Sequence, residues 1–512
     1  MRKDRRVSER ESPTIVIAGG GTAGWMAAAA FARFLAPRWR IRLVESEAIG
    51  TVGVGEATIP PIRAFNAGLG IDEAEFVRET QGSFKLGIEF AGWNGPDSRY
   101  IHAFGGIGRP LGLIGFLPYW LRHRAEGGTR GLWDFAPGAV AAYQNRFGHP
   151  QQRAGGPPSG IAWAYHFDAS LYAAYLRRYA EARGVERHEG RILDVARDGE
   201  SGDISALILD GERMIEGDLF VDCTGFAALL AGKALGTPYR DWTHWLPCDR
   251  ALAAPCARTD PLTPYTRATA RAAGWQWRIP LQHRTGNGLV YSSAHIADDA
   301  AADMLLANLD GEALGDPRPL RFTTGRREQA WTRNCVSLGL AGGFLEPLES
   351  TSIHLVQIGI AELLKFLPGR AIAEADRAAY NRRIAFETDR IRDFIVLHYH
   401  ANGREGDFWR DCRAMAIPDT LAEKIALFRA NGRIVRVDEE LFTEVGWMQV
   451  MLGQGMEPLG YHPLADALTA DQLAEFIALA AADAGRQAAA LPLHQDFIAA
   501  RCAAPSPERI PA

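Results

Sequence analysis

The chain has 512 residues, enough for roughly three domains and a large hydrophobic core. A hydrophobic share of 47%, a charged share of 23% and a net charge of -5 are ordinary for a globular protein, and they give no electrostatic reason to expect nucleic acid or an anionic membrane as a partner. The basic start, residues 1–6, is followed by polar residues where a signal peptide would be apolar, and the apolar runs are too short to span a bilayer. We therefore expect a cytoplasmic protein. Six scattered cysteines without a C-x-x-C pair predict reduced structural thiols and no metal site.

The first elements predict a βαβ unit around a glycine-rich turn. Apolar residues 14–18 and 41–44 predict strands, and residues 25–31 predict the helix between them. The turn reads Gly19-Gly20-Gly21-Thr22-Ala23-Gly24, and Glu45 follows about 20 residues later, where a ribose-binding acid is expected. Such glycines let a pyrophosphate approach, and the free N–H groups at the helix start meet its charge. The glycine motif alone would fit an ordinary turn equally well, but with strand, helix and acid present it predicts dinucleotide binding.

Later segments favour FAD over NAD as that dinucleotide. Residues 192–195, 204–209 and 215–221 predict short strands joined by turns, a meander whose last strand returns to the main sheet. A third segment, residues 335–344, predicts a strand that runs into a glycine-rich turn. This arrangement is typical of an α/β, glutathione-reductase-like FAD-binding fold built from separated segments.

The following stretch predicts a helix with serine and threonine at its start. Residues 355–367 are apolar with helical periodicity and end at Pro368-Gly369. Thr351 and Ser352 could cap this helix, or the free backbone N–H groups around them could hold a small anion, and the two interpretations are compatible. Beyond residue 370 the pattern is largely helical, with candidate helices at 421–428, 439–451 and 472–500.

Two further segments carry residues of chemical interest. Residues 84–90 alternate, which predicts one strand with Lys85, Gly87 and Glu89 on the face opposite the apolar residues. Most single lysines are solvated, so this pattern alone does not indicate catalysis. Residues 275–280 read W-x-W-x-I-P and would place Trp275 and Trp277 on one face of a strand, although paired tryptophans more often belong to a core.

These motifs together resemble the tryptophan halogenases, a family of flavin-dependent halogenases. The resemblance rests, in the family's order, on residues 19–28, 53–60, 84–90, 275–280 and 346–351. It implies that reduced FAD, O2 and a halide ion make hypohalous acid, which crosses an internal tunnel to a lysine that halogenates an aromatic ring. No second nucleotide fingerprint is evident, so a separate NAD(P)H-dependent flavin reductase is the expected partner.

The resemblance also implies roles for individual residues. Lys85 would be the lysine, since partial burial lowers the pKa of an amine and makes it more nucleophilic, or lets it hydrogen-bond hypohalous acid. Glu349, with Glu346 as the nearby alternative, would stabilise and deprotonate the ring. Thr351 and Ser352 would hold the halide. The substrate or tunnel residues would be His102, Phe104, Trp275, Trp277 and Trp447. The cofactor-binding residues would be Gly19, Gly21, Thr22, Ala23, Gly24, Glu45, Gly55, Ala57, Leu340 and Ile353.

Two departures from the family pattern concern the halide and the substrate. The family commonly has glycine where this chain has Ser352, which would matter if the halide site needs a special backbone angle there, and bromide is a reasonable hypothesis beside chloride. The tyrosine-rich stretch and polar clamp of free-tryptophan halogenases are not found, and residues 439–447 are not a convincing replacement. Indole, a substituted indole or another electron-rich aromatic is therefore expected.

The predicted organisation is a discontinuous FAD-binding core and a helical region that covers the substrate. The core would span residues 12–370, with substrate-side insertions at about 84–150 and 238–300, and the helical region residues 371–512. Two alternative functions remain open at this point: an FAD-dependent aromatic monooxygenase, and a flavin-binding protein without catalytic activity.

Overall fold

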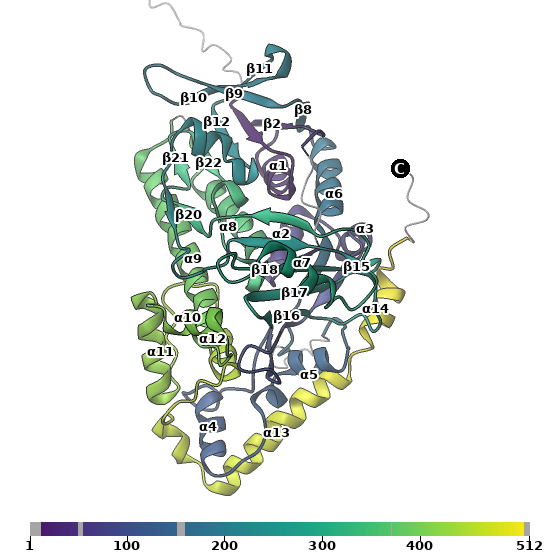
Figure 1. Cartoon of the computed structure of the whole chain (residues 1–512), viewed down its shortest axis with the longest axis vertical. Coiled ribbons are helices and arrows are strands. Elements are labelled where there is room, and N and C mark those ends of the chain that lie inside the picture. Colours follow the sequence, from purple (N-terminus) through teal and green to yellow (C-terminus); the bar gives the residue numbers. More distant parts are fainter. Residues whose placement is uncertain (1–11, 50–54, 151–158, 370, 506–512) are drawn as a thin grey trace, which may run out of the picture.

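The computed structural model describes residues 12–49, 55–150, 159–369 and 371–505. Figure 1 shows a mixed α/β molecule in which sheets lie one above the other and the C-terminal helices run along the lower edge. This confirms the mixed α/β class and the helical C-terminal region. None of the helices in these ranges has the length and apolar character that crossing a bilayer requires.

The upper sheet has six strands that come from separated parts of the chain. Its order is β21-β22-β12-β1-β2-β8, and all neighbours are parallel except β21 with β22. The strands are β1 (Thr14–Ala18), β2 (Arg40–Glu45), β8 (Glu186–Glu189), β12 (Leu219–Asp222), β21 (Trp331–Thr332) and β22 (Cys335–Ser337). All of β1 is buried, as expected for a parallel strand covered on both faces. The predicted βαβ unit is confirmed.

The meander lies at the top of the molecule in Figure 1 and differs from the prediction in one place. It consists of β9 (Ile192–Arg197), β10 (Ile204–Leu209) and β11 (Met214–Glu216). The single strand predicted at 215–221 is wrong, because the chain turns at Gly217 and Asp218 and enters a different sheet as β12. The Asp218 carboxylate accepts a hydrogen bond from the Thr14 N–H (2.7 Å), which fixes this turn to β1.

The lower sheet carries the W-x-W-x-I-P segment. Its order is β19-β14-β18-β17-β16-β5-β6, and β15 also pairs with β18. The strands are β5 (Gly87–Ala91), β6 (Arg99–Ala103), β14 (Arg250–Ala253), β15 (Cys256–Ala257), β16 (Thr266–Arg271), β17 (Gly274–Pro280), β18 (Arg284–Tyr291) and β19 (Arg318–Arg321). Two small sheets have the orders β3-β7-β4 and β13-β20-β23. Their strands are β3 (Gly55–Ala57), β4 (Ser83–Lys85), β7 (Ala164–Asp168), β13 (Tyr239–Asp241), β20 (Gly325–Arg327) and β23 (Gly343–Phe344).

The motif at 84–90 forms two strands, so the prediction of one strand is wrong. β4 ends at Lys85 and pairs with β7, whereas β5 begins at Gly87 and pairs with β6 and β16. Leu86 joins them, with its N–H donating to the Pro264 carbonyl (2.7 Å) and its carbonyl accepting from the Phe104 N–H (2.7 Å). This change of sheet takes Lys85 into the interior, where its side chain is completely buried.

The helices cover the sheets and connect the two halves. They are α1 (Thr22–Leu35), α2 (Pro61–Leu69), α3 (Glu73–Glu79), α4 (Leu117–Ala125), α5 (Pro137–Tyr143), α6 (Ala169–Glu181), α7 (Asp298–Leu306), α8 (Ser352–Lys365), α9 (Glu374–His400), α10 (Asp407–Ala414), α11 (Asp419–Asn431), α12 (Glu444–Gly453), α13 (Ala470–Ala489) and α14 (His494–Arg501). The long helix α9 contacts β21 of the upper sheet as well as α8, α10, α11 and α12. It therefore links the cofactor side of the molecule to the C-terminal helices.

The C-terminal helices follow the sequence pattern with two corrections. The helix predicted at 421–428 is confirmed as α11, but the one predicted at 439–451 begins only at Glu444. The helix predicted at 472–500 is two helices, α13 and α14, because Pro492 lies between them and cannot donate a backbone hydrogen bond. All six cysteines are free and buried, which confirms their structural character.

Asn334 joins the meander to the upper sheet and offers a test of this arrangement. Its buried side chain accepts from the Ile204 N–H (2.9 Å) and donates to the carbonyls of Ile204 (2.8 Å) and Asp218 (3.2 Å). We expect Asn334→Ala to lower the free energy of unfolding by about 2–4 kcal/mol, since each buried backbone group left unpaired costs about 1–3 kcal/mol. Denaturant unfolding measures the loss. Asn308→Ala, which removes one bond within a helix end, is the control, and an equal loss in both variants would contradict this account.

Candidate functional site

The glycine-rich turn has the backbone that a pyrophosphate site requires. Gly19 has φ 108°, and a Cβ there would overlap the carbonyl of Cys223, the residue that follows β12. A Cβ on Gly24 would overlap the Gly19 carbonyl, so the helix α1 packs directly on the turn. A Cβ on Gly21 would meet no atom within 4 Å, and Gly21 lies at the N-cap of α1. The turn therefore leaves open space in front of the free N–H groups of the helix start.

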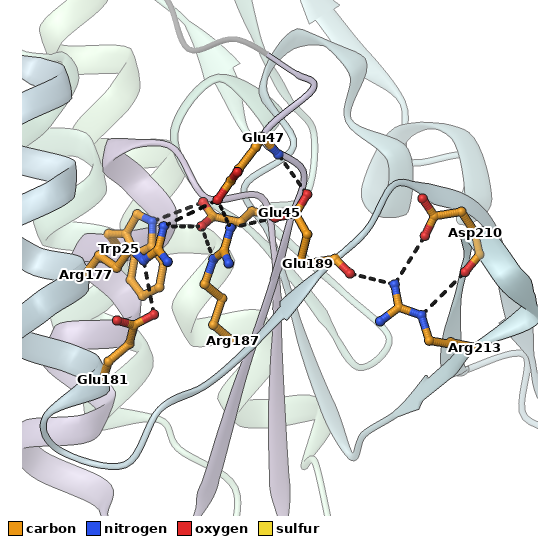
Figure 2. A network of polar contacts seen from close by, with 9 residues as sticks. All are labelled: Trp25, Glu45, Glu47, Arg177, Glu181, Arg187, Glu189, Asp210 and Arg213. Carbon is orange, nitrogen blue, oxygen red and sulfur yellow. Dashed lines mark hydrogen bonds and ion pairs between the residues drawn. The ribbon is translucent and has the colours of Figure 1, made fainter. Parts of the chain in front are cut away.

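Glu45 lies across this turn and is held by a network of charged side chains (Figure 2). One carboxylate oxygen accepts from Trp25 Nε1 (3.2 Å), and the other accepts from Arg187 Nε (2.6 Å). A guanidinium nitrogen of Arg177 lies 3.6 Å from the second oxygen. A Cβ on Gly20 would overlap the carboxylate, so only glycine lets Glu45 take this place. The acid is thus fixed beside the turn, where the ribose of a dinucleotide is bound in folds of this kind.

The other predicted cofactor residues fall around the same turn. Thr22 opens α1, and Ala23 faces the turn at residues 339–341, where a Cβ on Gly339 would lie 3.0 Å from the Ala23 Cβ. That turn carries the half-exposed Leu340. Ile353 is buried in the first turn of α8. Residues 53 and 54, the first two of the predicted motif at 53–60, lie outside the described part of the chain.

The strand β3 connects the cofactor side to the tryptophan segment. Gly55 and Gly286 pass so closely that a Cβ on Gly286 would lie 3.3 Å from the Gly55 Cα, and Ala57 closes the same strand. All of β17 is buried, and its two tryptophan rings lie 6.1 Å apart. A Cβ on Gly288 of β18 would overlap the Trp277 ring, so glycine lets this ring lie flat across the neighbouring strand. The two rings are therefore packed into the lower sheet near its contact with β3, and we call this buried pair the tryptophan wall.

Lys85 ends β4 in a buried position between Ser350 and Phe104. Its Nζ donates to the Ser350 Oγ (2.7 Å) and lies 5.3 Å from the centre of the Phe104 ring. Burial lowers the pKa of Lys85 to about 7, and the negative charge of Glu349 opposes this shift only in part. A large fraction of this amine is therefore neutral near pH 7, as a nucleophilic amine must be.

Two buried histidines fix the strand that carries Lys85. His166 on β7 places its Nδ1 2.9 Å from the Ser83 Oγ. His494 on α14 accepts the Phe84 N–H at its Nε2 (3.1 Å) and contacts a backbone carbonyl with its Nδ1 (2.8 Å). Burial lowers the pKa of both rings, that of His494 to about 4, so both are neutral at pH 7. The last helix of the chain therefore positions β4.

Glu349 is a fully buried carboxylate with a histidine at each oxygen. His102 Nδ1 lies 2.8 Å from Oε2, and His398 Nε2 lies 2.9 Å from Oε1. Burial alone would raise the pKa of Glu349, but the charge and hydrogen bonding of His102, together with those of His398, lower it to about 2. Glu349 is therefore an anion throughout the neutral pH range.

Glu346, the alternative acid, lies in a different environment. Its Oε2 accepts hydrogen bonds from Trp275 Nε1 (2.9 Å) and from the Tyr399 hydroxyl (2.5 Å). Burial raises the pKa of Glu346 to about 7, against the lowering effect of these two bonds. It anchors the tryptophan wall, while Glu349 is the carboxylate whose charge reaches Lys85.

The backbone of the turn between Glu349 and α8 shows why a serine can occupy position 352, where the family commonly has glycine. Ser350 has φ 58°, so the left-handed residue lies before the Thr-Ser pair. Ser352 is the first residue of α8 and has an ordinary helical backbone, so it needs no glycine. Thr351 makes no capping bond with its side chain, and that part of the expectation is wrong. The free N–H groups at the start of α8 remain available to an anion.

Aromatic side chains, the predicted Phe104 among them, gather around His102. The Phe104 ring lies 6.4 Å from it, and the rings of Phe394 and Phe442 lie 5.6 Å and 6.0 Å away. Trp447 packs edge-on against Phe394 at 4.8 Å, which places it one aromatic layer behind His102. The structure thus brings Lys85, Glu349 and these rings into one region.

Several residues of this region have no counterpart in the sequence motifs. They are Phe394, His398 and Tyr399 on α9, Phe442 before α12, and His494 on α14. One signal for His398 was available: it interrupts the apolar run at 394–399, and a polar side chain in such a run must find a buried partner. Which partner it finds depends on long-range packing.

A family model described as tryptophan halogenase matches residues 14–470. The chain belongs to the tryptophan halogenase family. Xcc4156, a flavin-dependent halogenase from Xanthomonas campestris, is 50% identical, and the match covers 97% of this chain and 100% of that one with a TM-score of 0.94. BrvH, a flavin-dependent halogenase from Brevundimonas sp. BAL3, is 45% identical over 97% of this chain and 100% of its own, with a TM-score of 0.92.

A relative in the same family is named for its substrate. Tryptophan 6-halogenase SttH from Streptomyces toxytricini is 34% identical over 511 residues, which cover 92% of this chain and 95% of SttH. The protein is a flavin-dependent halogenase, and the predicted enzyme class is confirmed. Membership of this family decides against the two alternatives, the aromatic monooxygenase and the flavin-binding protein without catalysis.

The charged network around Glu45 predicts which arginine supports FAD binding. We expect Arg187→Gln to raise the Kd for FAD about tenfold, equivalent to about 1.4 kcal/mol, because Glu45 loses its 2.6 Å partner. Titration of flavin fluorescence measures the change. Arg213→Gln is the matched control, since Arg213 bonds Asp210 (3.2 Å) and the Glu189 carbonyl (2.6 Å) instead (Figure 2). Equal losses in both variants would indicate a general effect of positive charge and would contradict the positioning of Glu45.

Proposed function

We propose that this halogenase is a cytoplasmic enzyme that uses reduced FAD, O2 and chloride or bromide to halogenate indole, a substituted indole or another electron-rich aromatic. The observation that carries the proposal is the complete burial of Lys85 beside Ser350 and Phe104, within the field of the Glu349 charge. Reduced FAD with O2 supplies, when bound, the oxidising power that turns halide into hypohalous acid. A separate NAD(P)H-dependent flavin reductase would provide the reduced flavin.

The residues for FAD would act together in a glutathione-reductase-like arrangement. The glycine-rich turn and the start of α1 would bind the pyrophosphate, and Glu45 would bind the ribose. Segments around Gly55, Ala57, Leu340 and Ile353 would contact the rest of the cofactor. The fit is supported by the open space before Gly21 and by the position of Glu45 over Gly20.

Lys85 would transfer the halogen. Its neutral amine attacks the halogen of hypohalous acid: an N–X bond forms, the O–X bond breaks, and the oxygen leaves as water with the amine proton. The aromatic carbon then takes the halogen from nitrogen, and the nitrogen takes up a proton in exchange for the one that the ring loses, which restores the amine. The ammonium form would instead hydrogen-bond the oxygen of hypohalous acid and make its halogen more electrophilic. A pKa of about 7 makes both forms available at neutral pH.

Glu349 would stabilise the ring cation and take its proton. The sum of the two steps is ArH + HOX giving ArX + H2O, so one C–H proton must be removed. With a pKa of about 2, Glu349 is a weak base, but the ring cation is a strong acid, and a carboxylate that stays charged also stabilises that cation. Both tasks favour an ionised group fixed near Lys85.

The remaining predicted residues would separate and position the reactants. The N–H groups at Thr351 and Ser352 would hold the halide at the start of α8. Trp275 and Trp277 would keep the aromatic substrate away from the flavin, which favours halogenation over direct hydroxylation. His102, Phe104 and Trp447 would supply the aromatic surroundings of the substrate ring.

The stretch before α12 supports a substrate without an amino-acid end. Glu440 in this stretch is buried, and its carboxylate pairs with the buried Lys424 at 2.9 Å. The ammonium of Lys424 also lies 5.1 Å from the centre of the Trp447 ring. These charges are therefore engaged with each other, which favours an indole-like ring over free tryptophan.

The test of this proposal is a product assay. Purified protein is incubated with FAD, a flavin reductase, NADH, O2, indole and either bromide or chloride, and the products are analysed by mass spectrometry. We expect products with halogen isotope doublets. Lys85→Ala should reduce them by about 10²- to 10⁴-fold, the usual contribution of a positioned acid–base group.

Lys365→Ala is the matched control, because Lys365 is exposed on α8 and pairs with Glu362 at 2.6 Å. It should halogenate like the unchanged enzyme. A product that gains one oxygen, whatever the halide and whatever residue stands at 85, would refute the proposal.

A further inference from the structure

His398 contacts Glu349 although no sequence motif marks it. Its ring is fully buried, and its Nε2 lies 2.9 Å from Glu349 Oε1. On the other side, its Nδ1 lies 2.8 Å from the carbonyl of Phe394, one turn earlier in α9. The backbone is also fixed here, since Gln454 donates to the His398 carbonyl (2.9 Å). The ring is therefore hydrogen-bonded at Nδ1, while Nε2 and Oε1 are in close contact and have no other partner in the described part of the chain.

The chemistry of these partners determines how the ring is protonated. A backbone carbonyl only accepts hydrogen bonds, so Nδ1 must carry a proton. The other nitrogen, Nε2, faces a carboxylate oxygen at 2.9 Å, and two bare lone pairs would repel each other at that distance. A proton on Nε2 makes this contact attractive, and it favours the ionised form of Glu349.

We propose that His398 is a positioning residue for halogenation: its ring, in contact with Oε1, favours the ionised carboxylate of Glu349 and fixes its orientation beside Lys85. The inference rests on the proposed function, in which Glu349 stabilises the ring cation and takes its proton. His398 would act through Glu349, the charged group that its Nε2 contacts. Loss of the histidine should change the charge of Glu349 before it changes anything else.

Among the titratable groups around Glu349, His398 is the one in contact with its Oε1 oxygen. Lys85 from β4, Tyr100 and His102 from β6, and His398 from α9 are the titratable groups whose charge couples to Glu349. Tyr100 is kept neutral, since burial and then the Glu349 charge raise its pKa well above the usual value. His102 contacts the other carboxylate oxygen. Oε1 is thus the oxygen that His398 serves.

The surroundings of His398 itself are aromatic. Its ring lies 4.7 Å from that of Phe90, 5.9 Å from Trp93 and 5.4 Å from Phe394, and these side chains carry no charge. Within the described ranges no trio of His, Cys, Asp or Glu side chains, this one included, is placed to hold a metal ion. Glu349 is accordingly the charged partner of His398.

The first experiment needs no substrate. Infrared spectra of the full-length protein, recorded between about pH 7 and pH 4, report the protonated carboxyl of Glu349, which Glu349→Gln identifies by removing it. We expect no such band in the unchanged enzyme. In His398→Asn, which keeps a donor to the Phe394 carbonyl but does not reach Glu349, the midpoint should rise by about 1–3 pH units, the effect of one neighbouring charge.

His400→Asn is the matched control, because His400 lies on the same helix and the pKa of its ring is lowered by burial and then by the charge of Arg429. Its spectrum should resemble that of the unchanged enzyme. An unchanged Glu349 titration in His398→Asn would overturn the proposal.

The second experiment measures where activity is lost. With indole, His398→Asn should form at least about tenfold less halogenated product, equivalent to about 1.4 kcal/mol of barrier. Formation of hypohalous acid, captured by a scavenger without substrate, should be unchanged because Lys85 and the cofactor residues are intact. His398→Gln places an amide N–H near the Nε2 position, so it should restore part of the product. As the pH is lowered, this variant should lose activity at a higher pH than the unchanged enzyme does.

These measurements distinguish a failure of the proposed halogenation from a failure of the role of His398. If the unchanged enzyme halogenates nothing, the proposed function fails, while the infrared comparison still tests His398 and Glu349. If His398→Asn does not fold, as judged by circular dichroism and FAD binding, His398→Gln carries the same titration. Equal product and equal pH dependence in His398→Gln, His398→Asn and His400→Asn would overturn the positioning role.

Discussion

The buried charge of Glu349 is the constraint on which the arrangement of this enzyme depends. An ionised carboxylate without water costs several kcal/mol unless cations and donors surround it. Parts of the chain far apart in sequence meet this demand: β6 brings His102, α9 brings His398, and β4 brings Lys85. The turn at 346–350 must fold against all of them at once. This requirement ties the lower sheet, the turn and the long helix to one relative position.

The C-terminal helices consequently contribute side chains to the region around Glu349 and Lys85 and do more than cover it. His398 and Tyr399 of α9 contact Glu349 and Glu346, the two acids of one turn, and His494 of α14 holds the backbone of β4. The first two contacts set the charge of one carboxylate and anchor the tryptophan wall through the other. The third fixes the strand that ends in Lys85. The packing of these helices therefore determines the geometry of the site.

What the sequence predicts well is local, and what it misses depends on distant contacts. The glycine-rich turn and the strand ending at Glu45 follow from spacing and alternation within short windows, and the structure confirms these elements. The burial of Lys85 could not be predicted in this way, because it requires the chain to leave one sheet at Leu86 and enter another. The left-handed backbone at Ser350 and the pairing of His398 with Glu349 likewise depend on partners that only the folded chain brings together.

The same constraint explains how Lys85 can stay partly neutral beside a carboxylate. An unshielded anion next to a buried lysine would hold the ammonium strongly and remove its nucleophilicity. Burial has the larger influence here: it lowers the pKa of Lys85 to about 7, although the charge of Glu349 acts in the opposite direction. The two histidines lower the pKa of the Glu349 carboxyl against the effect of burial, while burial lowers the pKa of the lysine. The interior thus holds an ionised acid near a partly neutral amine, which is the pair of charge states that the proposed halogen transfer requires.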